Sequence, residues 1–245
     1  MGPHARCKGS LVPPAEPFQY PLPATPEPSS LVDFGEVRSS VKALTSVDSD
    51  LAPALLHLAY SCAATFRTTD YLGGCNGARI RFHLDSFSDI DSSALEALNP
   101  IKSKFGDRLS YADLIVMAGS VAVGEITGEP VTFCGGRTDA SASDPDGWEY
   151  VSLGLSSRGY DSINGLSKTE FVALEGLVNG GTSYLRSSAA SKSHHLSSSS
   201  LARHAYAYVF DAALFKADAV KAWELLMSAD RFDIEGSEDK FCKQY

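Results

Sequence analysis

His57 and Ser61 are the residues with the clearest potential for chemistry, and they stand four positions apart. On a helix this spacing places two side chains on one face, within reach of a hydrogen bond. A histidine that takes the proton of a serine hydroxyl is the arrangement of a nucleophilic hydrolase. The sequence has neither a GxSxG turn nor an oxyanion-hole motif around this pair. A packing role for His57 and Ser61 is therefore favoured over hydrolysis.

Three further histidines, His194, His195 and His204, raise the question of a metal site. A ligating imidazole normally holds a carboxylate or another acceptor on its second nitrogen, and the sequence shows no such group nearby. The five cysteines also lack the paired CxxC spacing of a zinc site. We therefore expect no metal site. Whether Cys62 and Cys75 form a disulfide stays open, with a role as small packing residues favoured.

The charge balance limits the partners that the chain can have. Its 245 residues include 21 Lys and Arg against 30 Asp and Glu, which gives a net charge of −9. Such a chain is poorly suited to neutralise phosphates, so no nucleic-acid partner is expected. Hydrophobic residues make up 44% of the chain, enough for a sizeable core. No apolar run approaches the length of about 18 residues that a membrane-spanning helix needs, although association with a membrane complex stays possible.

The chain divides into three parts by composition. Residues 1–29 hold eight of the 12 prolines, which predicts an extended N-terminal arm that lies either free in solvent or along a partner chain. Residues 30–235 carry helical periodicity and are expected to form one domain. Within it, residues 183–200 are rich in serine and are expected to form a loop, because such a segment cannot fill a core. Residues 236–245 are expected to be a C-terminal tail.

Apolar residues in the domain recur at three- and four-residue intervals, which predicts helices and an all-α class. The stretch from Ser110 to Glu125 is so apolar that we expect a buried central helix there. Asp113 lies inside this stretch, and a buried carboxylate needs a cationic partner, for which Arg79, Arg81 and Arg137 are the candidates. The other helices are expected around residues 34–44, 51–62, 92–105, 168–177 and 206–227.

Three segments carry a family resemblance. Residues 73–82 read GGCNGARIRF, residues 100–128 read PIKSKFGDRLSYADLIVMAGSVAVGEITG, and residues 136–139 read GRTD. They resemble motifs of the class I haem peroxidases, which comprise ascorbate peroxidase, cytochrome c peroxidase and catalase-peroxidase. Residues 208–233 are also similar to the final helix of catalase-peroxidase. The resemblance implies a haem-peroxidase-type helical fold, truncated on the proximal side, where the Ser-rich stretch stands.

The distal residues of that family are replaced in this chain. The family carries Arg-x-x-Trp-His on one helix, where His moves the peroxide proton and Arg stabilises the developing charge. By the resemblance, His57 stands at the Arg position, Tyr60 at the Trp position and Ser61 at the His position. Asp91 stands where the family has an Asn that orients the distal His. The aligned residues therefore lack the family's distal acid–base group.

The proximal iron ligand of the family also has no counterpart. The family's segment VALSGGHT is similar to residues 172–179, which read VALEGLVN. The ligand position is then Val178, or Leu177 if the alignment moves by one residue, and neither side chain can bind iron. The resemblance thus predicts a degenerate pseudoperoxidase that is not an enzyme and holds no cofactor. Ligation of a displaced haem by His194, His195 or His204 is the less favoured interpretation.

From these losses we predict a structural or interaction subunit of a larger complex, contacted partly through the N-terminal arm. By analogy with the family, a chloroplast thylakoid setting, such as a photosystem, is the first expectation, and a mitochondrion is the second. The alternative is a haem peroxidase that reduces hydrogen peroxide with ascorbate or another donor through a non-standard haem site. Whether the former haem cavity is filled by side chains stays open.

Overall fold

The computed structural model describes residues 22–68, 73–83, 89–141 and 165–245. The predicted all-α class is confirmed, since helices dominate the described residues and the strands are two short segments. In chain order the main elements are α1 (Phe34–Val47), α2 (Leu51–Ala63), α3 (Asp89–Phe105), α4 (Tyr111–Thr127), β1 (Thr132–Cys134), α7 (Lys168–Asn179), α8 (Gly181–Ala190), α9 (Ser199–Phe210), α10 (Ala212–Met227), α11 (Glu238–Phe241) and β2 (Cys242–Gln244).

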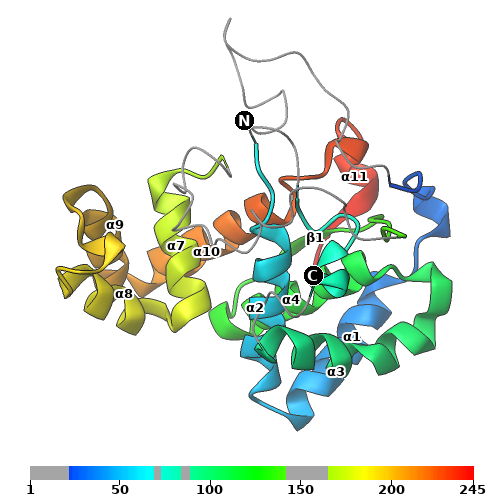
Figure 1. Ribbon diagram of the computed structural model, residues 1–245, viewed down its shortest axis with the longest axis horizontal. Coiled ribbons are helices and arrows are strands. Elements are labelled where there is room, and N and C mark those ends of the chain that lie inside the picture. The colour runs from blue at the N-terminus through cyan, green and yellow to red at the C-terminus, as the bar shows by residue number, and fades with distance from the viewer. Residues whose placement is uncertain (1–21, 69–72, 84–88, 142–164) are drawn as a thin grey trace, which may run out of the picture.

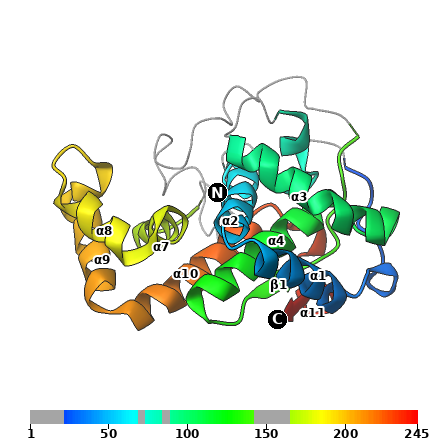
Figure 2. The ribbon, with the colours of Figure 1, turned by 90° about the horizontal axis from the view of Figure 1, so that it is seen from below.

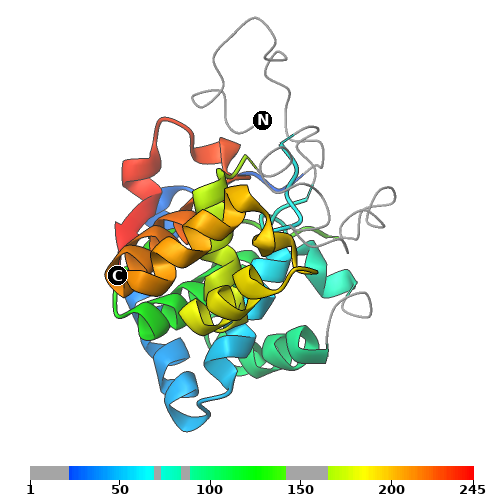
Figure 3. The ribbon, with the colours of Figure 1, turned by 90° about the vertical axis from the view of Figure 1, so that its left-hand side faces the viewer.

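The helices form two groups that α10 connects. Figures 1 and 2 show α1 to α4 together on one side and α7 to α9 at the opposite end, with α10 running from the α9 end toward α4. Figure 3, seen from the end that carries α8 and α9, shows the yellow and orange helices in front of the green and blue ones. None of the helices in the described part of the chain combines the length and apolar character needed to cross a lipid bilayer.

Local sequence signals define where the helices begin and end. Ser110 accepts a hydrogen bond from the backbone of Asp113 and so begins α4. Ser167 and Glu170 form a reciprocal capping box at the start of α7. The helices α4 and α7 end at Gly128 and Gly180, both in the left-handed conformation that glycine adopts without strain.

The helix α4 lies at the centre of the core, as its apolar sequence predicts, and is buried over most of its length. Gly119 allows its neighbours to approach closely, because a Cβ at this position would clash with Ala59 of α2 and lie 2.7 Å from Trp223 of α10. The indole of Trp223 is fully buried and donates a hydrogen bond of 3.1 Å to Ser120. The contact of α4 with α2 and α10 therefore depends on a small residue at position 119.

The expected Ser-rich loop over residues 183–200 is corrected by the structure. Helix α8 covers its first part, a 3-10 turn covers His195–Ser197, and α9 starts at Ser199. Leu185 and Ala189 stand four residues apart on α8 and are buried together with Ser188, while Ser187 and Arg186 are exposed on the other face. A composition rich in serine thus conceals a short amphipathic helix.

Two other boundaries differ from the expectation. The segment expected as a single helix over 206–227 breaks at Asp211, whose side chain accepts from the backbone of Leu214 and caps α10. The expected tail over 236–245 contains α11 and β2. Strand β2 pairs antiparallel with β1, and the disulfide Cys134–Cys242 joins the two strands. The end of the described chain is therefore part of the fold.

The last part of the expected N-terminal arm lies on its own chain. Thr25 donates a hydrogen bond of 2.7 Å to Asp233, and the carbonyl of Pro23 accepts one of 3.2 Å from Thr138. Residues 1–21 of the arm lie outside the described residues, so its use by a partner chain stays a prediction. The open question of Cys62 and Cys75 is answered, because the two form a disulfide between the end of α2 and the following loop.

Candidate functional site

The helices α2 and α3 bring His57 and Asp91 together. One face of α2 carries Leu55, Ala59 and Cys62 into the core, so His57 falls on a different face and is half-buried. Nδ1 of His57 lies 2.8 Å from a carboxylate oxygen of Asp91. The side chain of Asp91 is only 1% exposed, against 38% for His57. The carboxylate of the pair is therefore buried, whereas the imidazole is accessible.

Ser61 completes this group at longer range. Its Oγ lies 3.4 Å from Nδ1 of His57 and 3.4 Å from the second carboxylate oxygen of Asp91. The hydrogen bond to Asp91 raises the pKa of His57 above its ordinary value, and partial burial opposes this effect. Because Nδ1 faces the carboxylate, Nε2 is the nitrogen of His57 that has no hydrogen-bond partner among the described residues.

A largely apolar cavity of about 780 Å³ adjoins this histidine. Its walls come from four helices, with Leu44 and Val47 from α1, His57 from α2, Ala94 from α3 and Val178 from α7. This volume falls within the range of about 300–1,000 Å³ typical of small-molecule sites. The described residues therefore leave a cavity between the helix that carries the expected distal residues and the helix that carries the expected proximal position.

The expected site residues occupy different surroundings. His57, Ser61 and Asp91 form the hydrogen-bonded group, and Val178 lines the adjoining cavity. Tyr60 is partly buried against the core, and Leu177 is buried within it. Sequence reasoning treated His57 and Asp91 as replaced positions and did not predict that they pair. The spacing of 34 residues gives no signal of the contact, which arises from the packing of α2 against α3.

A second polar group surrounds His194 and His195, and its carboxylate was not predicted from the sequence. Glu175 on α7 accepts a hydrogen bond of 3.0 Å from the hydroxyl of Tyr184 and lies 3.5 Å from Nε2 of His195. Nε2 of His194 is 3.3 Å from the same hydroxyl. Burial raises the pKa of Glu175. The signal in the sequence was a lone carboxylate in the apolar segment VALEGLVN.

His204 lies apart from this cluster, with Nδ1 3.3 Å from Thr169 and Nε2 3.2 Å from the guanidinium of its neighbour Arg203. Among the described residues, no three or more His, Cys, Asp or Glu side chains are grouped in a way that could hold a metal ion. His194 and His195 therefore share one polar group with Glu175, and His204 lies outside it.

The carboxylate of Asp113 forms the expected buried pair, and Arg137 is its partner. The distance is 3.3 Å, and both side chains are almost fully buried. Asp113 also accepts from the backbone of Gly136 at 2.8 Å. Asp139, at the end of the GRTD segment, accepts from the backbone of Tyr111 and of Ala112 at the start of α4. This motif thus holds the connection after β1 against the central helix and has a structural role.

The sequence of this chain is similar to sequences of known proteins. A family model described as Peroxidase matches residues 37–207. The chain is 36% identical over 163 residues to catalase-peroxidase 1 of Pyricularia oryzae, covering 62% of this chain and 21% of that protein. It is 31% identical over 197 residues to a catalase-peroxidase of Escherichia coli, and 33% identical over 196 residues to one of Caulobacter vibrioides, covering in each case 73% of this chain and 26% of the relative. The chain thus spans about a quarter of the length of these relatives.

These matches overturn the prediction that the chain is not an enzyme. All three relatives are called catalase-peroxidases, and the matching model is that of peroxidases. That prediction followed from the loss of the family's usual ligand and base. His194, His195 and His204 were considered as alternative haem ligands, whereas His57, which lies beside the cavity and pairs with Asp91, was not. The helical fold and the family are as the sequence motifs indicated. This chain belongs to the peroxidase family.

Proposed function

We propose that the chain reduces hydrogen peroxide at the expense of an organic donor, through a haem held in the cavity beside His57. The observation that carries this proposal is the imidazole of His57, which adjoins a cavity of about 780 Å³ and is paired through Nδ1 with a buried carboxylate. Membership of the peroxidase family supports peroxide reduction as the type of reaction. The chain spans only about a quarter of the length of its relatives, so that it catalyses this reaction is our proposal.

The donor set decides whether these residues fit a haem. Val178 and Leu177 stand at the expected ligand position and offer no donor atom, so the usual attachment is excluded for these side chains. His57 offers Nε2, with Nδ1 directed to Asp91, and ligating histidines almost always carry such a partner on the second nitrogen. The residues present therefore fit a haem that His57 would hold through Nε2.

The residues of the chain have separable roles in this proposal. When bound, haem would supply the redox chemistry that delivers two electrons to peroxide and takes them one at a time from the donor. Asp91 keeps the proton on Nδ1 of His57 and fixes the ring orientation, because its carboxylate is buried and cannot turn to solvent. Leu44 and Val178 are partly buried and give the cavity apolar walls, and Val47, which is 89% exposed, lies at its rim.

The acidic rim of the cavity favours one class of donor over another. Asp48 and Asp50 both line the cavity and are both exposed. Their carboxylates repel an anionic donor such as ascorbate and leave a neutral phenol unaffected. We therefore propose a neutral phenolic donor, with ascorbate as the weaker substrate.

Haemin titration tests the proposal. The purified protein should develop a Soret band that saturates at one haem per chain, and His57→Ala should abolish it. His204→Ala is the matched control, because it removes a histidine outside the cavity, and it should leave the titration unchanged. Peroxide-dependent oxidation of guaiacol should then exceed that of ascorbate. A titration that gives no saturable band, or the same band with His57→Ala, would overturn the proposal.

The expected association with protein partners through residues 1–29 and the expected location in a chloroplast or a mitochondrion stay predictions. Co-purification of the full chain with a native complex, compared with a chain that lacks residues 1–21, is the direct test of the first. Because Pro23 and Thr25 contact the chain's own Thr138 and Asp233, this truncation removes only the part of the arm whose contacts are not described.

A further inference from the structure

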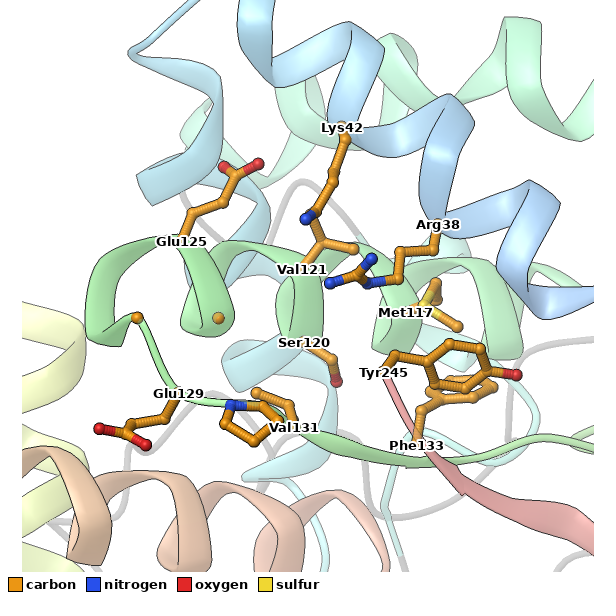
Figure 4. Close-up of a pocket in the computed structure, with 13 residues that line it drawn as sticks. Arg38, Lys42, Met117, Ser120, Val121, Glu125, Glu129, Val131, Phe133 and Tyr245 are labelled. Carbon is orange, nitrogen blue, oxygen red and sulfur yellow. The ribbon is translucent and has the colours of Figure 1, made fainter.

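A second cavity of about 400 Å³ lies between α1, α4 and the paired strands β1 and β2 (Figure 4). It shares no lining residue with the cavity beside His57. Its volume is in the lower part of the range for small-molecule sites, which suits a ligand of one or two rings. The proposed peroxidase function makes no use of it.

Two cationic side chains from α1 converge on this cavity. Arg38 and Lys42 stand four residues apart, are half-buried, and point toward one another in Figure 4. Like charges at this spacing destabilise a helix, and burial adds a desolvation cost. Within the described part of the chain, neither side chain forms an ion pair of 4.0 Å or less. An anion in the cavity would relieve both costs.

The acidic residues on the rim do not neutralise this charge. Glu125 is exposed and accepts a hydrogen bond of 3.1 Å from Thr45. Glu129 is also exposed, and Figure 4 shows its carboxylate directed away from the two cations. Among the described residues, the two cations on this side of the cavity are therefore not held in ion pairs by the carboxylates of the rim.

The opposite wall is aromatic and carries one further donor. The rings of Tyr245 and Phe133 lie next to each other with centroids 6.4 Å apart, and Figure 4 places both below the guanidinium of Arg38. Ser120 accepts a hydrogen bond from Trp223, so its own hydroxyl proton can be directed to a ligand. The cavity thus combines two cations, a hydroxyl donor and an aromatic surface.

We propose that this cavity binds a small aromatic anion of the aryl carboxylate class. The carboxylate accepts charge-assisted hydrogen bonds from Arg38 and Lys42, and the ring packs against Tyr245 and Phe133. Arg38 suits a carboxylate because its planar guanidinium can donate to two oxygens at once, and the aromatic surface favours a ligand with a ring over inorganic phosphate. Gly128 ends α4 in the left-handed conformation, and a Cβ at this position would meet no neighbouring atom within 4 Å, so this edge of the cavity is open for entry.

Calorimetric titration with 2-naphthoate tests the proposal on the full chain without added haem. We expect one saturable site, with 2-naphthamide, the neutral analogue, binding about ten- to a hundredfold more weakly because charge-assisted hydrogen bonds are lost. The double variant Arg38→Gln/Lys42→Gln should weaken 2-naphthoate by a similar factor. Arg186→Gln/Lys221→Gln, which removes the same charge at exposed positions on α8 and α10, should leave the affinity unchanged.

Three results would contradict the proposal. Equal affinity of the wild type for 2-naphthoate and 2-naphthamide would exclude an anion site, and this comparison does not depend on how any variant folds. Inorganic phosphate that binds as tightly as 2-naphthoate would exclude the aromatic contribution. Unchanged binding in the Arg38→Gln/Lys42→Gln variant would place the ligand elsewhere. None of these results bears on haem binding by His57, so the two proposals can fail separately.

Discussion

The two charged pairs Asp113–Arg137 and His57–Asp91 differ in how far their side chains are buried. Asp113 and Arg137 are both almost fully buried, and Asp113 also accepts from the backbone of Gly136. His57 and Asp91 are closer together, at 2.8 Å, but only the carboxylate is buried. In the first pair both partners are enclosed by the fold, whereas the second pair leaves one nitrogen of an accessible imidazole beside a cavity.

This difference separates a structural pair from a candidate functional one. A buried charge that loses its partner has no access to solvent, so it carries a large desolvation cost. A half-exposed imidazole that loses its partner can turn to water at little cost. The Asp113 pair is therefore expected to contribute mainly to folding, and the His57 pair mainly to ligand binding.

The largest expected effect is that of Asp113→Ala. It leaves Arg137 buried without its carboxylate and should lower the free energy of unfolding by about 3–5 kcal/mol. Burial raises the pKa of Asp113 and Arg137 opposes that rise, so the carboxylate depends on this partner. Urea unfolding followed by circular dichroism gives the value. Asp91→Ala is the matched control, with a loss of about 1 kcal/mol expected, and equal losses in the two variants would remove the distinction between the two pairs.

Each of the two charged pairs lies near a disulfide, and the two disulfides close loops of different length. Cys134–Cys242 closes a separation of 108 residues beside the Asp113 pair, since the carbonyl of Cys134 accepts from Arg231 and Arg137. Cys62–Cys75 closes only 13 residues at the end of α2. Replacing both cysteines of a disulfide by alanine should cost about 2–4 kcal/mol, with the larger loss for Cys134 and Cys242 because the longer loop gains more entropy when unfolded.

Thermal and urea unfolding of the two double-alanine variants, measured without reductant, give this order. The wild-type protein with both disulfides intact is the reference. A larger loss for the Cys62 and Cys75 variant would mean that the region around α2 depends more on its cross-link than the region around Asp113 does.

Sequence reasoning recovered the features that depend on local spacing or on a single buried charge. The apolar positions of α4 predicted its central place, and the buried Asp113 required one of three arginines, of which Arg137 is the partner. These predictions succeed because helical periodicity and the cost of an unpaired charge act wherever the residues stand. The helices follow from the same periodicity, whereas the family resemblance came from the motifs at residues 73–82, 100–128 and 136–139.

The remaining features depend on packing between distant segments. The pairing of Cys134 with Cys242 and the cluster of Glu175 with His195 join residues whose spacing follows no helical or strand period. The contact of His57 with Asp91 was hidden for a further reason, because both positions were interpreted as losses of family residues. The serine content of α8 outweighed its two buried apolar positions in the prediction of a loop.

A smaller effect is expected from the pH dependence of the His57 pair in protein without haem. Asp91 raises the pKa of His57 above its unfolded value near 6.5, so the charged pair stabilises the fold fully below that pH. The stabilisation is lost as the pH rises through the folded pKa of His57. Since the imidazole is 38% exposed, solvent screening limits the effect to less than about 1 kcal/mol.

Unfolding of the wild type and of Asp91→Asn, measured from pH 5 to pH 9, checks this dependence. The difference in unfolding free energy between the two proteins should shrink as the pH rises, because only the wild type has a carboxylate that favours the charged imidazole. A difference that grows with pH would mean that the pair is neutral in the folded protein, and it would contradict a raised pKa for His57.

The smallest expected effect is the coupling energy of an exposed ion pair, with which the buried pairs can be compared. Lys104 lies 3.4 Å from Glu36, with side chains 52% and 59% exposed. The coupling between them, from a double-mutant cycle of Glu36→Gln and Lys104→Gln, should be below about 0.5 kcal/mol. The cycle is needed because Glu36 also stabilises the first turn of α1 through the helix dipole, which a single substitution would include. If this coupling exceeded that of His57 with Asp91, burial would not determine the order of the charged pairs, and the contrast between the enclosed and the accessible pair would lose its physical basis.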